Sequence, residues 1–119
     1  MLGFGAHQRF YIYNTPADFR KGAYGLSGIV RNEMGRDPLS GDVYVFFNRS
    51  RNSVKILAWD RDGFVIYGKR LERGSYESLS AVMEGKSYSI RYQHLVMLLS
   101  GISLVGLHQR LRYEMKSAV

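Results

Sequence analysis

The sequence feature that most constrains the fold is a series of three β-prone runs separated by short turns. The runs are residues 43–48, 54–59 and 64–71, and each is rich in β-branched and aromatic side chains. Asp62-Gly63, between the second and third runs, is a strong hairpin signal because a tight turn needs residues that tolerate a positive φ. The polar residues 49–53 separate the first two runs. The sequence therefore predicts an antiparallel three-stranded meander.

An amphipathic helix is predicted before the meander, over residues 17–34. Its apolar side chains, among them Phe19, Leu26 and Val30, recur at helical spacings of three and four. Thr15-Pro16, immediately before it, is typical of a helix N-terminus. We expect this helix to cover one face of the sheet through these three side chains.

The remaining segments complete an α+β fold in a single domain, residues 1–119. Residues 9–13 form a short N-terminal β-prone run, and residues 86–90 supply a further strand. Apolar residues predict a short second helix over 95–102. The basic C-terminal tail, 103–119, is either a frayed helix or disordered. A chain of 119 residues buries enough surface to fold without a disulfide or a structural metal, and it contains no cysteine.

Positive charge is concentrated in two parts of the chain. The sequence has 17 Lys and Arg against 10 Asp and Glu, a formal net charge of +7 at pH 7. Residues 43–74 carry seven basic and three acidic side chains, and residues 86–119 carry five and one. Clustered cations are what binding to a polyanion such as nucleic acid requires. Solubility or a protein partner is the alternative explanation for the excess.

The predicted hairpin sorts its side chains onto two faces, because successive residues of a strand alternate. One face receives Lys55, Leu57, Trp59, Ile66 and Arg70. The other receives Val54, Ile56, Ala58, Val65, Tyr67 and Lys69. The second face is more uniformly apolar and should meet the core. The first combines cations with an aromatic ring, which favours contact with phosphates and bases, and the alternative is a buried Trp59 beside solvated cations.

Six cations form the predicted nucleic-acid-binding set: Arg49, Arg51, Lys55, Lys69, Arg70 and Arg73. We expect them to be exposed and to form one positive surface. Arg49 and Arg51 belong to a short polar turn, which either clamps phosphates with two guanidinium groups or is a solvated hairpin tip. Because the six cations lie on a sheet and its turns, rather than on a helix of base-reading side chains, DNA contact should be dominated by phosphates.

The sequence predicts no catalytic residue, metal site or cofactor. Asp60 and Asp62 lie in a turn, where aspartate is favoured for its conformation. His7, His94 and His108 lack the spacing of paired metal ligands. The sequence also lacks a phosphate-binding glycine loop and a serine-nucleophile motif. We therefore expect neither enzymatic activity nor a small-molecule substrate.

The sequence also bears on where the protein is found. No apolar run approaches the ~18 residues that a membrane span requires. The first nine residues contain no signal-peptide core. The expectation is a cytoplasmic protein that does not contact the membrane.

Three strings carry a resemblance to a known family. They are Phe19-Arg20-Lys21-Gly22 followed by Gly25-Leu26-Ser27, the run from Lys55 to Phe64, and the run from Lys69 to Gly74. In order and spacing, over residues 8–102, the chain resembles the small TnpB-type accessory proteins of insertion-sequence family sixty-six, from bacterial transposons. The resemblance implies a role in DNA transposition beside a separate large transposase that holds the catalytic acids. It supplies no catalytic residue for this chain.

Two segments depart from the family pattern. Ile90-Arg91-Tyr92-Gln93 lacks the serine or threonine that usually caps the second helix. That cap is then either supplied by Ser89 or absent. Residues 75–86 differ from the aromatic-proline stretch of the family.

Three functions are compatible with these observations. The favoured function is a non-catalytic accessory factor that contacts DNA and assists the transposase. The second is a protein-interaction module that contacts transposase subunits with little DNA binding. The third is a small toxin-like ribonuclease in which Tyr67, Lys69 and Arg70 act without a metal.

Overall fold

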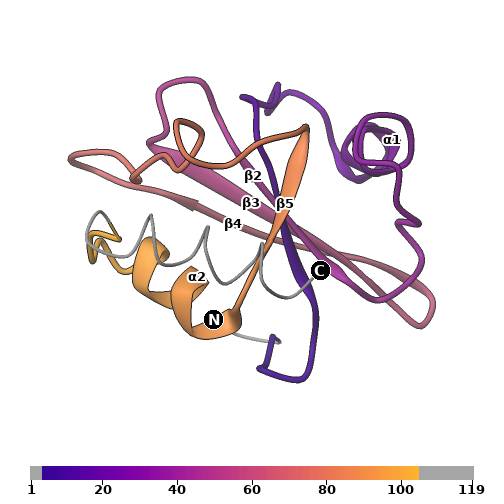
Figure 1. Ribbon diagram of the computed structural model, residues 1–119. Coiled ribbons are helices and arrows are strands. Elements are labelled where there is room, and N and C mark those ends of the chain that lie inside the picture. Colours follow the sequence, from indigo (N-terminus) through magenta and orange to yellow (C-terminus); the bar gives the residue numbers. More distant parts are fainter. Residues whose placement is uncertain (1–3, 105–119) are drawn as a thin grey trace.

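Five strands and two helices make up the described part of the chain, residues 4–104, in this computed structural model (Figure 1). In chain order they are β1 (Phe10–Tyr13), α1 (Ala23–Asn32), β2 (Val43–Phe47), β3 (Ser53–Asp60), β4 (Gly63–Arg70), β5 (Ser87–Ile90) and α2 (Tyr92–Leu99). The strands form one sheet in the order β4-β3-β2-β1-β5. The predicted α+β class is confirmed.

The sheet is mixed. β2, β3 and β4 form the predicted antiparallel meander. β1 lies on the other side of β2 and runs parallel to it, with Phe10 opposite Val43, while β5 pairs antiparallel with β1. Parallel neighbours need a crossover connection, and α1 is the helix in the connection from β1 to β2. This parallel pairing was not predicted from the sequence.

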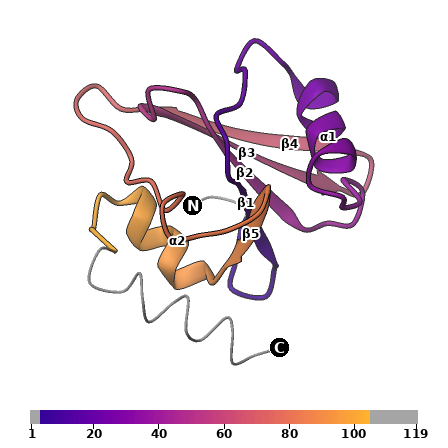
Figure 2. The same ribbon diagram turned by 45° about the horizontal axis from the view of Figure 1, so that its top comes forward.

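Both faces of the sheet are covered, because α1 and α2 lie on opposite sides of it (Figure 1, Figure 2). On one face, α1 packs the fully buried Leu26 and Val30 against Tyr44, Phe46 and Leu57. On the other face, α2 and the segment before β5 pack on the alternate side chains of the strands. The buried residues of this second cluster include Phe10, Ile12, Val45, Ile56, Tyr76, Leu79, Leu95 and Leu98.

The prediction that a single face of the hairpin meets the core is therefore incomplete. Leu57, on the face expected to contact bases, is fully buried in the cluster with α1. Trp59 on the same face is half-buried, and its ring meets that of Phe64 edge-on with 5.1 Å between centroids. Trp59 is therefore a packing residue rather than an open stacking platform.

α1 is shorter than predicted, since it covers Ala23–Asn32 rather than 17–34. The segment before it forms a loop that is bonded to the sheet, where the Ala17 N–H donates to the Phe47 carbonyl oxygen over 2.9 Å. Gly22 occupies the N-cap position, and no side chain caps the helix. A long-range backbone bond has therefore outweighed the local capping signal.

The predicted second helix is present, but it begins and ends three residues earlier than expected. α2 spans Tyr92–Leu99 rather than 95–102, and its N-cap residue, Arg91, makes no side-chain cap hydrogen bond. At the start of the predicted tail, Leu104 is buried and its N–H donates to Glu77 Oε2 over 2.6 Å. The rest of the predicted basic tail lies outside the described residues.

Candidate nucleic-acid interface

The turn between β2 and β3 is held in a fixed shape by its own polar groups. Asn48 Nδ2 donates to Asn52 Oδ1 over 2.6 Å, and the Ser53 N–H donates to Asn48 Oδ1 over 3.0 Å. The Arg51 N–H donates to the Asn48 carbonyl oxygen over 3.0 Å. Arg51 has a φ of 56°, a left-handed conformation that is uncommon for a residue with a side chain. The turn is thus a well-defined support for the side chains it carries.

Arg51 is directed into the protein rather than toward solvent, which corrects the expectation that all six cations are exposed. Its Nε donates to the Tyr76 carbonyl oxygen over 3.0 Å, and its Nη2 donates to the Glu77 carbonyl oxygen over 2.6 Å. The guanidinium lies 4.1 Å from the centre of the Phe47 ring. Burial lowers the pKa of this guanidinium. Arg51 therefore ties the segment after β4 to the β2–β3 turn.

Lys55 is also held internally. It is half-buried on the face that α1 covers, and its Nζ donates to the Phe19 carbonyl oxygen over 2.9 Å. The ammonium lies 5.2 Å from the centre of the Phe19 ring, within the range of a cation–π contact. Lys55 therefore fastens the loop before α1 to the sheet, and the expectation that it is mostly exposed is wrong.

The other four predicted cations are exposed at one end of the sheet, and they are called the basic end: Arg49, Lys69, Arg70 and Arg73. The antiparallel register places Arg70 opposite Ser53, so β4 ends where the β2–β3 turn begins. The Leu71 N–H donates to the Asn52 carbonyl oxygen over 2.7 Å and fixes the two segments together. Among residues 4–104, no salt bridge involves a member of the basic end.

The basic end surrounds the end of the sheet instead of lying on one face. Lys69 is on the α2 side, where it lines a small cavity of about 160 Å³ with Val54, Tyr67 and Ser100. Arg70 follows Lys69 along β4, so its side chain is on the α1 side. Because Arg70 is on the opposite face from Tyr67 and Lys69, these three do not converge as the ribonuclease alternative requires.

α1 carries an exposed aromatic side chain that the sequence analysis did not select. Tyr24 is 92% exposed. Lys21 and Arg31 are exposed near it and line, with it, a shallow depression of about 350 Å³. The sequence held the signal, because Tyr24 is two positions from the buried Leu26 and so lies about 200° away around the helix.

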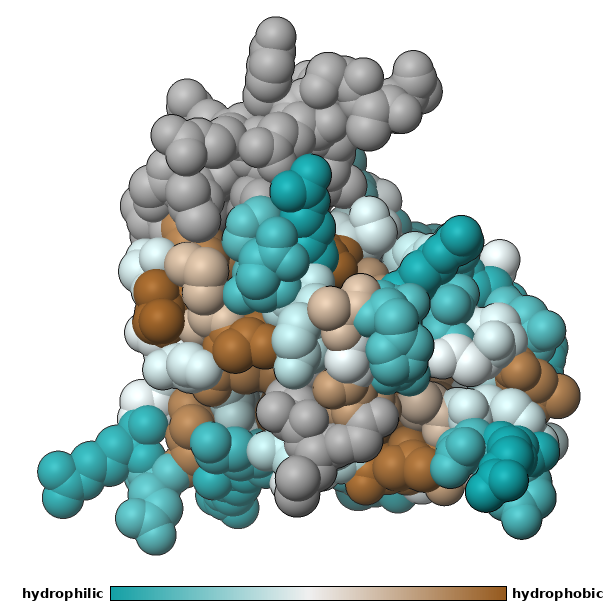
Figure 3. Space-filling view, turned by 90° about the horizontal axis from the view of Figure 1, so that it is seen from below, coloured by the Kyte–Doolittle hydropathy of each residue, from teal (hydrophilic) through white to brown (hydrophobic). Residues whose placement is uncertain are grey.

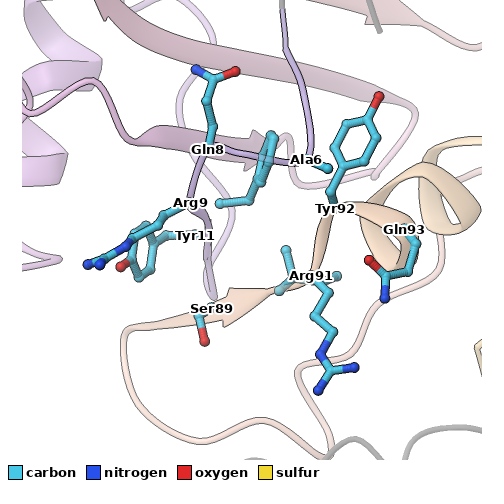
Figure 4. A pocket seen from close by; sticks show the side chains of 10 residues that line it. Ala6, Gln8, Arg9, Tyr11, Ser89, Arg91, Tyr92 and Gln93 are labelled. Atoms are coloured by element: carbon cyan, nitrogen blue, oxygen red, sulfur yellow. The ribbon is translucent and has the colours of Figure 1, made fainter.

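A further depression lies at the opposite end of the sheet from the basic end, between β1, β5 and the start of α2 (Figure 4). It has a volume of about 510 Å³, and Gln8, Arg9, Ser89, Arg91 and Gln93 are among its lining residues. The guanidinium groups of Arg9 and Arg91 point in different directions in Figure 4. These two arginines therefore do not form one anion clamp.

Apolar and hydrophilic residues alternate over the side of the molecule that carries α2. Seen from below, the coloured part of the surface shows separate brown patches with teal and white residues between them (Figure 3). Within residues 4–104, no three His, Cys, Asp or Glu side chains gather as a metal site would require. Neither of the described helices has the length and apolar character to cross a bilayer.

A protein-family model matches most of the chain. The model, described as IS66 Orf2 like protein, covers residues 8–109. This range includes the seven helices and strands found among residues 4–104 and the whole basic end. No solved structure gives a significant match.

Two proteins of Sinorhizobium fredii are similar in sequence. The uncharacterized protein y4hO is 35% identical over 102 residues, which cover 86% of this chain and 87% of that protein. The uncharacterized protein y4jC is 32% identical over 76 residues, which cover 64% of this chain and 65% of that protein. The match therefore spans just under two thirds of the length of y4jC.

Proposed function

We propose that this chain, which belongs to the family of IS66 Orf2-like proteins, is a non-catalytic accessory factor that binds DNA through the basic end and assists a separate transposase. Family membership carries an accessory role associated with transposition. The contact with DNA, the assistance to the transposase and the absence of catalysis are the proposal. A bacterial element keeps its DNA in the cytoplasm, so we place the protein there.

The observation that carries the proposal is the basic end itself. Arg49, Lys69, Arg70 and Arg73 are exposed together around one end of a rigid sheet. The turn that bears Arg49 is ordered by its own hydrogen bonds, so it does not have to be ordered when it binds. Arginine and lysine side chains on such a support are suited to phosphate oxygens, which position a protein on DNA without reading its sequence.

A salt titration tests the contact with DNA. The variant Arg49→Gln/Arg73→Gln removes two exposed cations from the basic end. The slope of log affinity against log salt should fall in magnitude by roughly 1.8, at ~0.9 per phosphate contact on duplex DNA. The fall should be similar on terminal-repeat DNA and on random DNA of equal length, because phosphate contacts carry no sequence information directly.

The matched control is Arg9→Gln/Arg91→Gln, which removes the same charge from the opposite end of the sheet. It should leave the slope close to that of the wild-type protein. Equal changes in the two double variants would mean that binding is spread over the whole surface. An unchanged slope and affinity for Arg49→Gln/Arg73→Gln would remove the basic end as the DNA contact.

The protein-interaction function remains the second candidate, and the exposure of Tyr24 favours it. A tyrosine that is 92% exposed offers a large, rigid contact area, and tyrosine is enriched in protein interfaces. We propose the α1 surface formed by Lys21, Tyr24 and Arg31 as the contact for transposase subunits of the same element. Tyr24→Ser should reduce co-purification with these subunits and leave the salt slope on DNA unchanged. Undiminished co-purification would exclude this contact.

A further inference from the structure

β4 is an open edge of the sheet. It is the outermost strand in the order β4-β3-β2-β1-β5, which Figure 2 shows from top to bottom, and among the described residues it pairs with β3 only. Its eight residues pair with β3 without interruption, from Gly63 opposite Asp60 to Arg70 opposite Ser53. β4 also exposes one large apolar side chain on each face, Val65 at 44% and Ile66 at 39%.

The backbone groups that β4 turns outward can be identified from the ladder. Along an antiparallel edge strand, every second residue bonds to the neighbouring strand and the residues between them point their N–H and C=O groups outward. Because the Leu71 N–H bonds to the Asn52 carbonyl oxygen, the odd-numbered residues of β4 are the ones that bond to β3. The N–H and C=O groups of Phe64, Ile66, Gly68 and Arg70 therefore point away from the sheet. A row of such groups is a template for another strand. Proteins commonly blunt such edges with proline, a bulge, a very short strand or charged side chains. β4 has none of the first three, and its two charged side chains, Lys69 and Arg70, are confined to its last two residues.

We propose that β4 pairs antiparallel with β4 of a second copy of this chain, about a two-fold axis at Ile66. A two-fold axis makes the contact isologous, so each residue and its partner exchange places. In this register Ile66 meets Ile66 of the second copy, and Phe64 meets Gly68. On the other face Val65 meets Tyr67. Aromatic rings beside glycine and aromatic–β-branched pairs are favourable across strands.

Charge along the hairpin selects this antiparallel arrangement. The turn that begins β4 carries Asp60 and Asp62, and the strand ends with Lys69 and Arg70. Antiparallel pairing brings the acidic turn of one copy beside the basic strand end of the other. With the axis at Ile66, Arg70 lies beside Asp62 of the second copy. An axis at Val65 would instead bring Asp62 beside Gly68 of the second copy, which does not place it beside Arg70.

Sedimentation equilibrium of the full chain, without DNA, tests the pairing. The wild-type protein should show a monomer–dimer equilibrium that depends on concentration. Ile66→Lys places two ammonium groups at the axis and should shift the protein to monomer. The control Leu39→Lys makes the same substitution at another apolar side chain, which is 51% exposed between α1 and β2, and it should leave the equilibrium unchanged. A wild-type protein that is monomeric at every concentration, or an Ile66→Lys dimer of unchanged affinity, would overturn the proposal.

Exchanging the charges at Arg70 and Asp62 tests the register. Its result comes from a mixture of two variants, so a single variant that folds poorly cannot produce it. Arg70→Asp alone and Asp62→Arg alone should each dimerise roughly tenfold more weakly, because each sets like charges together twice about the axis. Mixing the two variants should restore association as a heterodimer, since both cross-strand pairs then have opposite signs. Because DNA is absent, a loss of phosphate contacts at Arg70 cannot produce this pattern. Failure of the mixture to associate better than either variant alone would exclude the register.

Discussion

Two arginines of the same turn have different roles because of their backbone positions. Arg49 is exposed at the tip of the turn. Arg51, two residues later, has a φ of 56° and turns its guanidinium back toward the carbonyl oxygens of Tyr76 and Glu77. The two side chains are chemically identical, so the backbone conformation and the distant carbonyl oxygens together make one arginine available to a ligand and the other structural.

Replacing each of these arginines by glutamine separates the two roles. Arg51→Gln should lower the free energy of unfolding by about 2 kcal/mol, since hydrogen bonds from a charged donor contribute ~1.5–3 kcal/mol. Arg49→Gln should change it by less than about 0.5 kcal/mol, as is usual for an exposed position. Urea denaturation measures both values. Equal stability of the two variants would contradict the internal role of Arg51.

Among the elements, α1 forms although its sequence is poor in helix formers. Gly25 and Gly28 lie inside its ten residues, and each weakens a helix by roughly 1 kcal/mol relative to alanine. Packing of Leu26 and Val30 against the sheet offsets this cost, because most helix stability in proteins comes from burial of an apolar face. A Cβ at Gly28 would have no neighbour within 4 Å, so the fold of this chain does not require glycine there.

Gly28→Ala should therefore stabilise the protein, by about 0.5–1 kcal/mol. The comparison is Gly25→Ala, whose Cβ would lie 2.7 Å from the Lys21 Cβ and would force the backbone at one of the two residues to shift, because a Cβ is fixed by its own backbone. We expect Gly25→Ala to give no gain or a loss of stability. Thermal and urea unfolding of the two variants measure the difference, and a loss of stability in Gly28→Ala would show that the glycine has a role in the folded chain.

At the scale of the whole molecule, covering both faces of the sheet buries several tyrosines. Burial raises the pKa of Tyr88 to about 12, although the nearby Arg51 acts in the opposite direction. Burial also raises the pKa of Tyr44 and of Tyr76. In the unfolded chain a tyrosine ionises near pH 10. The two-sided core therefore makes the fold sensitive to alkaline pH.

The free energy of unfolding should fall as the pH rises from about 10 to about 12. In that window the unfolded chain loses the Tyr88 proton while the folded chain keeps it, so the unfolded state binds fewer protons and is favoured. Below pH 10, Tyr88 is protonated in both states, so its contribution to the free energy of unfolding does not change with pH. Two units of pKa correspond to roughly 3 kcal/mol at most. Tyr88→Phe should make the free energy of unfolding fall less steeply with pH, and urea denaturation between pH 10 and 12 measures this. An equally steep fall in the variant and the wild-type protein would show that Tyr88 is not the group responsible.

The sequence by itself determined the features that depend on local interactions. The alternating side chains predict the β3–β4 hairpin and its two faces, because a short turn fixes register between strands that are adjacent in the chain. The predicted position of the turn is wrong by one residue: the turn is Arg61-Asp62, Gly63 already pairs with Asp60 in the sheet, and the left-handed φ of 52° is at Arg61. The buried residues Leu26 and Val30 follow from helical spacing alone. The same hairpin register brings the end of β4, with Lys69 and Arg70, beside the β2–β3 turn that carries Arg49.

Only the tertiary structure decided what depends on partners far along the chain. The parallel pairing of β1 with β2 joins residues on either side of α1, and no turn signal encodes it. The inward positions of Arg51 and Lys55 depend on backbone carbonyl oxygens 25 and 36 residues away. A carbonyl oxygen is present at every residue, so the sequence does not mark which one will accept a bond. The packing that brings these segments together makes that choice.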